Sequence, residues 1–187
     1  LHEGSVHGWG KASDIVKAYD QFLYKSNNDE LNYNTSSETT QTPLQSMRFT
    51  SIKVLVDDKE AGINEVVFGK SRKSNLSIEM HWKQDIKLPP PSLGITIHAM
   101  DGRMVGSAGT HFDGIETICN LEGQGKATVS FESLILLKGE YKIEAYLMCE
   151  KGILFYDQIM PVARFKIIQA ENDLEQGLVH LSRKWKI

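Results

Sequence analysis

The sequence predicts an antiparallel β-sandwich preceded by a short helix and a polar linker. From Leu44 onward, short runs rich in β-branched and aromatic residues alternate with turn residues. Asp101-Gly102 and Lys151-Gly152 stand between consecutive runs, and such pairs join the strands of hairpins. No helical periodicity is evident in this region. Runs of this length and spacing are typical of an antiparallel sandwich.

The first 44 residues differ from the rest of the chain. Apolar side chains recur there at helical spacing, and Ser13 or Asp14 is placed to cap a helix from about residue 13 to 25. The stretch "NNDELNYNTSSETTQTP" that follows has almost nothing to bury, so we expect a mobile linker. The predicted domains are a terminal helix (1–26), a linker (27–44) and the sandwich (45–187).

Nine strands are expected between residues 47 and 185. Prolines at 89–91 suit a loop or an edge and exclude a central strand there. The expected strands cover residues 47–56, 75–84, 93–100, 102–107, 127–133, 140–150, 153–160, 163–168 and 177–185.

Charge and cysteine content exclude several classes of function. The 21 basic and 24 acidic residues give a net charge of -3, which argues against a nucleic-acid partner and against a polybasic membrane contact. No apolar run is long enough to cross a bilayer. Cys119 and Cys149 lack zinc-ligand spacing. Cys149 continues an inward-facing alternation, so a buried thiol in a reducing compartment is expected.

The motifs of catalytic and metal sites are absent from the sequence or incomplete in it. Gly69-Lys70-Ser71 matches the end of a phosphate-binding P-loop, but Asn64 stands where that motif needs glycine, and a strand pattern follows. No GxSxG elbow and no HExxH pair occurs. The sequence therefore predicts no catalytic residue, no metal site and no cofactor.

Alternation within three strands predicts which side chains face outward. In residues 76–83, 93–98 and 141–147, every second position holds an aliphatic residue, Met80, Trp82 or Tyr141, so these positions are expected to face the core. If the three strands belong to one sheet, its outer face carries Glu79, His81, Thr96, His98, Lys142, Glu144 and Tyr146.

Three interpretations of that face remain open. An aromatic ring with carboxylate, imidazole and hydroxyl groups suits a sugar, because the ring packs on its C–H face while the polar groups bond its hydroxyls. The alternative is an ordinary solvated face of a sandwich. As a third reading, Glu79 and Glu144 would be the acid and base of a glycosidase.

The sandwich region resembles the Wzt C-terminal domain family, found in the nucleotide-binding subunit of ABC transporters that export bacterial O-antigen polysaccharides. The resemblance covers roughly Met47 to Ile187. It rests on the order of four segments, which are "GITIHAMDGRMVGS", "LILLKGEYKIEAYL", "GILFYDQIMPVARFKI" and "GLVHLSRKW". One departure is "GSAGT" at 106–110, where the family often has Gly-Thr-Asn-Thr, so the ligand can differ. Upstream, "GKASDIVKAYDQFLY" looks like the last helix of the transporter's ATPase domain.

This resemblance implies an immunoglobulin-like β-sandwich that binds carbohydrate without catalysis. It implies recognition of O-antigen polysaccharide, at its modified non-reducing terminus, on the cytoplasmic side of the inner membrane. The implied partners are the ATPase and transmembrane subunits and a second copy of the chain, the upstream domain being the ATPase. Tyr146 would stack on the sugar and Lys142 would also contact an anionic cap. The predicted glycan site comprises Glu79, His81, Thr96, His98, Lys142 and Tyr146. The alternative is a structural module for dimerisation or docking, without glycan contact.

Overall fold

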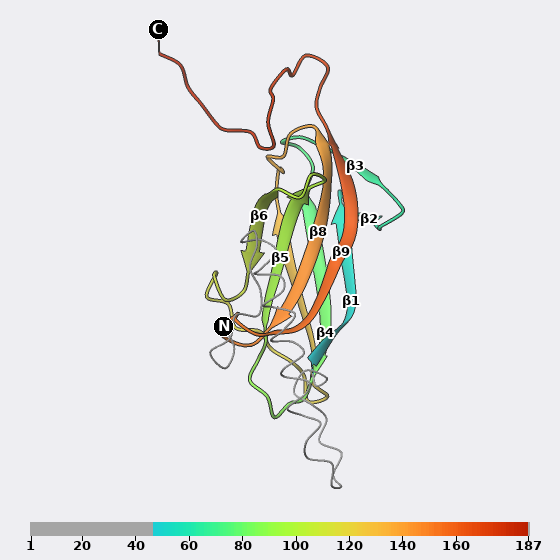
Figure 1. Ribbon diagram of the computed structural model, residues 1–187, viewed down its shortest axis with the longest axis vertical. Helices are drawn as coiled ribbons and strands as arrows, with labels where there is room; N and C mark the ends of the chain where they lie inside the picture. Colours follow the sequence, from blue (N-terminus) through green and yellow to red (C-terminus); the bar gives the residue numbers. More distant parts are fainter. Residues whose placement is uncertain (1–46, 187) are drawn as a thin grey trace, which may run out of the picture. The chain divides into compact units, whose positions relative to one another are not determined.

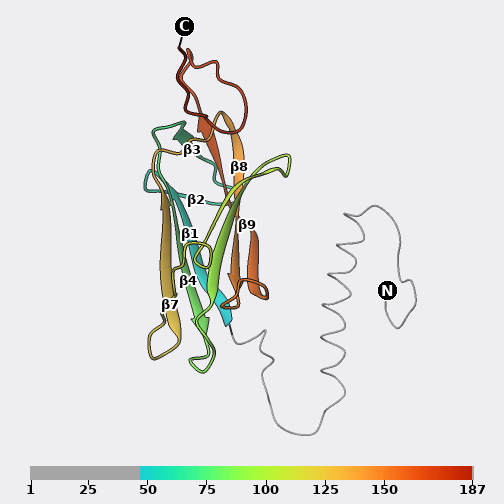
Figure 2. The same ribbon diagram turned by 90° about the vertical axis from the view of Figure 1, so that its left-hand side faces the viewer.

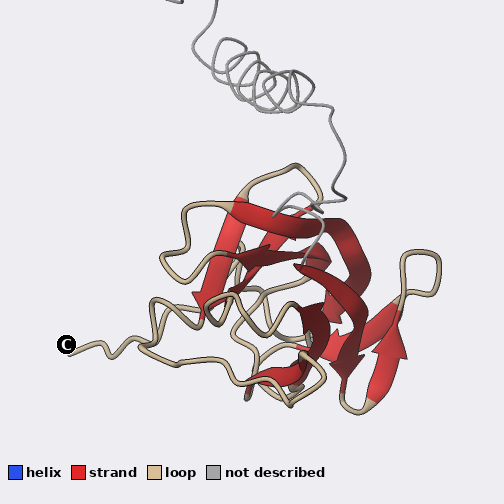
Figure 3. Ribbon diagram, turned by 90° about the horizontal axis from the view of Figure 1, so that it is seen from below, coloured by secondary structure: helices blue, strands red, loops and turns tan. Residues whose placement is uncertain are grey.

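The computed structural model describes residues 47–186, which fold as a two-sheet β-sandwich (Figure 1). Figure 3 shows strands and loops throughout this described part. The all-β sandwich is therefore confirmed, whereas the predicted helix at 13–25 and linker at 27–44 lie outside the described residues. The strands are β1 Met47–Val56, β2 Lys59–Ala61, β3 Val67–Lys70, β4 Leu76–Gln84, β5 Ser92–Ala99, β6 Met104–Gly109, β7 Gln124–Phe131, β8 Gly139–Met148 and β9 Phe155–Ile168.

The strands divide into two layers, seen side on in Figure 2. One sheet has the order β2-β1-β4-β7 and the other β3-β9-β8-β5-β6. All neighbours are antiparallel except β3 and β9, which are parallel. Within residues 47–186 there is no helix that is long and apolar enough to span a membrane.

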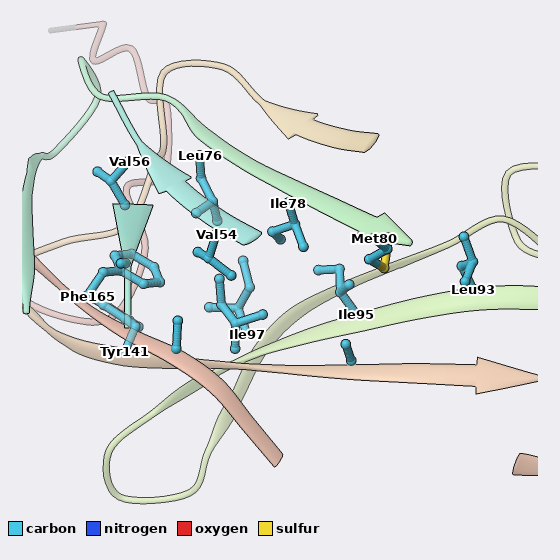
Figure 4. Packing of buried hydrophobic residues seen from close by; sticks show 14 of the residues in the cluster. Val54, Val56, Leu76, Ile78, Met80, Leu93, Ile95, Ile97, Tyr141 and Phe165 are labelled. Atoms are coloured by element: carbon cyan, nitrogen blue, oxygen red, sulfur yellow. The ribbon is translucent and has the colours of Figure 1, made fainter. Parts of the chain in front are cut away.

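The core lies between the two layers and follows the predicted alternation. Trp82 on β4 is 1% exposed, and its Nε1–H donates to Gln84 Oε1 at 2.9 Å. Tyr141 is fully buried, stacks on Phe165 at 5.7 Å between ring centroids, and donates to the Leu137 carbonyl at 2.8 Å. Its polar hydroxyl is thereby satisfied inside an apolar cluster. Figure 4 shows Tyr141 and Phe165 facing the aliphatic side chains of the opposite sheet.

Several strand predictions are confirmed and others are wrong. The hairpin of β5 and β6 turns at Gly102, whose φ of 89° suits glycine, and β1 has the expected bounds. The two runs expected at 153–160 and 163–168 form one strand, β9, whose pairing with β8 is irregular near its middle. Strand β8 ends at Met148, so Cys149 begins a turn and is only partly buried.

The expected strand at 177–185 is also wrong. Val179 forms an isolated bridge with Leu136, and residues 180–186 have no regular secondary structure. Charged side chains hold this segment. Arg72 pairs with Asp173 and, at 3.4 Å, with Glu175. The Glu175 carboxylate also contacts His180 Nδ1 at 2.7 Å and Arg183 Nη1 at 2.6 Å. We call these five residues the C-terminal clasp.

Close packing of Gly125 against Trp82 gives a direct test of this core. The two residues face each other across β7 and β4, and a Cβ at position 125 would overlap the indole ring. We expect Gly125→Ala to displace the ring and lower the free energy of unfolding by about 1–3 kcal/mol. Gly106→Ala is the control, since nothing lies within 4 Å of its added Cβ. Urea denaturation measures both, and equal stability of the two variants would contradict this packing.

The C-terminal clasp predicts a local effect on hydrogen exchange. Arg72→Ala removes two ion pairs to the 173–175 segment, so the His180 amide, which donates to the Ile135 carbonyl at 2.7 Å, should exchange several-fold faster. The neighbouring Lys73→Ala is the control, because Lys73 is exposed and its side chain bonds to no other described residue. Unchanged exchange in Arg72→Ala would show that the clasp does not hold the segment.

Candidate functional site

Five polar side chains gather on the outer face of the five-stranded sheet. They come from neighbouring positions of β5 and β8, where Thr96 faces Glu144 and His98 faces Lys142 across the ladder. Alternation along each strand directs the set outward, so side chains two residues apart lie side by side. The Glu144 cluster comprises Thr96, His98, Lys142, Glu144 and Tyr146.

Glu144 is the centre of this cluster and is only 7% exposed. Lys142 Nζ donates to Glu144 Oε1 at 2.7 Å, and the Tyr146 hydroxyl donates to Oε2 at 2.8 Å. His98 Nε2 lies 3.3 Å from the same Oε2 and 2.9 Å from Thr96 Oγ1. A buried carboxylate requires such partners, because an unpaired charge is costly away from water.

The pKa values in the cluster follow from burial and these bonds. Burial alone raises the pKa of the Glu144 carboxyl, but the bonds from Lys142 and Tyr146 and the nearby His98 outweigh it, so the pKa is lowered. Burial, and then the Glu144 carboxylate, raise the pKa of the Tyr146 hydroxyl. At neutral pH the cluster therefore contains an ionised carboxylate and a protonated phenol.

The predicted site included two residues that lie elsewhere. Glu79 and His81 are on β4, which belongs to the four-stranded sheet, so they face outward on the other side of the sandwich. The one-sheet assumption was wrong because alternation assigns a face but does not identify a strand's neighbours. Glu79 and Glu144 consequently cannot face one cleft as glycosidase acid and base, because the sheets lie between them.

Glu79 has its own partners on that opposite face. Lys126 Nζ donates to its Oε2 at 2.7 Å, and His81 Nε2 lies 2.7 Å from its Oε1. These bonds lower the pKa of Glu79 to about 2. The side chain keeps 25% of its surface exposed, so water screens the group far more than it screens Glu144.

The structure adds Glu144 and Phe155 to the residues selected from the sequence. Glu144 had the outward parity but was left out of the predicted site, and only its burial and bonds reveal its central position. Phe155, at the start of β9, lies 5.6 Å from Tyr146 between ring centroids and is 47% exposed. The alternation of apolar and polar residues could not select Phe155. The sequence predicts it within a separate strand and does not show which strands lie beside that strand.

The chemical groups of this arrangement suit a polyhydroxylated ligand. A carboxylate has about four acceptor positions and an ammonium three donors, and the cluster uses three contacts of Glu144 and one bond of Lys142. The remaining acceptor position of Glu144 and the remaining donors of Lys142 lie beside the partly exposed rings of Tyr146 and Phe155. Among residues 47–186, no three His, Cys, Asp or Glu side chains are grouped to hold a metal.

Acid should weaken the Glu144 cluster. A carboxyl with a lowered folded pKa contributes stability above its unfolded pKa, near 4.3, and loses it as pH falls through the folded pKa. We expect Glu144→Gln to cost about 1–3 kcal/mol at pH 7 and less at pH 3, because the stability that the carboxylate contributes is lost as the pH falls toward its lowered folded pKa. Urea denaturation at both pH values measures this, with the exposed Glu132→Gln as control. A pH-independent cost would refute the assignment.

Comparisons with known proteins agree with this fold. The family model described as the Wzt C-terminal domain matches residues 44–181. A crystal structure of the C-terminal domain of Wzt is similar with a TM-score of 0.57 and 11% identity, covering 76% of this chain and 84% of that one. A Bifidobacterium dentium β-glucuronidase has a TM-score of 0.40 and 11% identity over 65% of this chain and 18% of its own. No curated protein sequence matches. The chain belongs to the Wzt C-terminal domain family, which is known for the O-antigen-recognising module of an ABC transporter.

Proposed function

We propose that this immunoglobulin-like sandwich binds O-antigen polysaccharide through the Glu144 cluster, without catalysis, and so selects the polymer for export. The modified non-reducing terminus is the part of the polymer that the cluster receives. The observation that supports this face is its buried carboxylate. Lysine, tyrosine and histidine surround the carboxylate, and a partly exposed aromatic pair lies beside it. Membership of the family supports the polymer as ligand.

The chemistry of the cluster suits sugar hydroxyls. The Glu144 carboxylate accepts a hydrogen bond from a sugar hydroxyl. The Lys142 ammonium donates one, and the Thr96 hydroxyl can donate or accept. Both aromatic rings offer apolar surface to the C–H face of a pyranose, and Phe155 is the second stacking ring beside Tyr146. Bonds within the cluster fix these side chains before the ligand arrives, which reduces the entropy lost on binding. Lys142 also suits an anionic cap.

The proposed setting is the cytoplasmic face of the bacterial inner membrane. There the sandwich, as residues 45–187, works with the ATPase and transmembrane subunits of the transporter. In this proposal, residues 1–26 belong to the ATPase domain and residues 27–44 connect it to the sandwich. Two copies of the chain act together as a homodimer.

A structural module for dimerisation or docking is the second candidate. Exposed apolar side chains in the C-terminal segment favour it, because Leu181 and Trp185 are 69% and 85% exposed. Exposed apolar patches mark interaction surfaces, and these two residues are four positions apart in the sequence. In this alternative the sandwich contacts another subunit, and the polysaccharide contacts lie elsewhere.

Calorimetric titration of the chain with O-polysaccharide of its own strain tests the proposal. His98→Ala removes a contact of Glu144 and Thr96, so we expect about tenfold weaker binding, equivalent to about one hydrogen bond. His81→Ala is the matched control, since that histidine makes the corresponding contact on the opposite sheet and should leave affinity unchanged.

A second ligand separates the candidates. Polymer lacking its non-reducing terminal modification should bind more weakly than the complete polymer. If neither polymer binds while light scattering shows a folded dimer, the structural module is correct. Equal affinity in His98→Ala and His81→Ala would move the glycan site away from the Glu144 cluster.

A further inference from the structure

A cavity of about 420 Å³ lies at the loop end of the five-stranded sheet. It is formed by the loop before β5, the start of β5, the turn after β6 and the turn after β8. Its lining includes Pro91, Ser92, Thr110, His111, Glu116 and Glu150. This volume falls within the range of small-ligand pockets. None of these residues belongs to the Glu144 cluster.

The polar lining of this cavity is rich in acceptors. Glu116 and Glu150 are exposed and form no ion pair or hydrogen bond with any other side chain in the described part of the chain. Ser92 and Thr110 bring their hydroxyl oxygens to 3.2 Å from each other. Two free carboxylates attract hydroxyl or ammonium donors and repel an acidic sugar. The chemistry therefore fits a neutral or amine-bearing sugar.

An exposed aromatic ring belongs to the turn that contributes Thr110 and His111 to the cavity lining. Phe112 is 78% exposed, in the same turn as Thr110 and His111. The turn is braced, because the Thr110 amide donates to the Leu93 carbonyl at 2.9 Å and the Ile115 amide to the Thr110 carbonyl at 2.8 Å. The ring edge lies close over Gly109, where a Cβ would come within 2.9 Å of Phe112 Cδ2. The backbone thus holds an apolar ring in solvent, where it can stack on a sugar.

The cavity and the Glu144 cluster lie along the same two strands. Ser92 and Thr96 are four residues apart on β5 with the same parity, and Glu150 follows Glu144 by six residues along β8 and its end. At about 3.3 Å per strand residue, Ser92 and Thr96 are about 13 Å apart. A linear polymer that follows β5 and β8 can therefore reach both.

We propose that this cavity is a second saccharide subsite, which binds an internal neutral or amine-bearing sugar of a polymer whose terminus occupies the Glu144 cluster. The inference rests on the proposed function. With two subsites on one face, affinity rises with the length of the glycan until both are filled, because the second contact becomes intramolecular.

Calorimetry with fragments of the O-polysaccharide tests this subsite. The fragments share the non-reducing terminus and increase in length. Phe112→Ala and the double variant Glu116→Gln/Glu150→Gln should bind the longest fragment about tenfold more weakly and the shortest one as the unaltered chain does. His98→Ala should weaken binding of both. Phe68→Ala is the control, because Phe68 is also an exposed phenylalanine, at 59%, and lies on β3, at the opposite edge of the five-stranded sheet from β6.

The outcomes distinguish the two proposals. If both cavity variants bind the longest fragment normally while His98→Ala is weakened, the second subsite is wrong and the proposed function stands. If the unaltered chain binds no fragment, the proposed function fails and the subsite with it. Weakening of the shortest fragment by Phe112→Ala, with the thermal unfolding midpoint unchanged, would place the terminus in the cavity and overturn the division into two subsites.

Discussion

The outer face of the five-stranded sheet depends on one buried charge. Glu144 is 7% exposed, yet it stands on the solvent side of its sheet. A carboxylate in that position is tolerated only when polar partners surround it. Lys142 and Tyr146 donate to it, and His98 Nε2 lies 3.3 Å away. Each donor is thereby held in place by a partner that cannot move without losing its own bonds. The order of the face follows from this mutual dependence.

The two sides of the sandwich show that residue type alone does not define a site. Glutamate, histidine and lysine meet on both, as Glu79 with His81 and Lys126, and as Glu144 with His98 and Lys142. The glutamate side chain is 25% exposed in the first set and 9% in the second. Water screens and rearranges the first set, while burial makes the second a fixed array. Burial therefore selects the candidate face.

Local pattern predicted β1 and β4 to β8, and β9 as two separate runs, but neither β2 nor β3. It also predicted the direction of the side chains on β4, β5 and β8. Met47–Val56 was found with its observed bounds, Trp82 was assigned to the core, and the Asp101-Gly102 hairpin was recognised, because each depends on residues close in sequence. Sheet membership depends on pairing between distant strands. β4 pairs with β1 and β7, so Glu79 and His81 were assigned to the wrong side, and the burial of Glu144 could not be foreseen. The strand expected in the C-terminal segment is wrong for another reason. The apolar residues there suggest a strand, but ion pairs between charged side chains hold the segment.

The parallel pairing of β3 with β9 has a consequence for synthesis of the chain. Residues 67–70 pair with residues 165–168. During synthesis, β3 therefore leaves the ribosome almost a hundred residues before the strand with which it pairs. Contacts of such separation form slowly, and an unpaired strand edge invites association with other chains. β3 has only four residues and ends in Lys70. A short strand with a terminal charge is a poor template for aggregation, which protects the chain on the ribosome until its partner strand arrives.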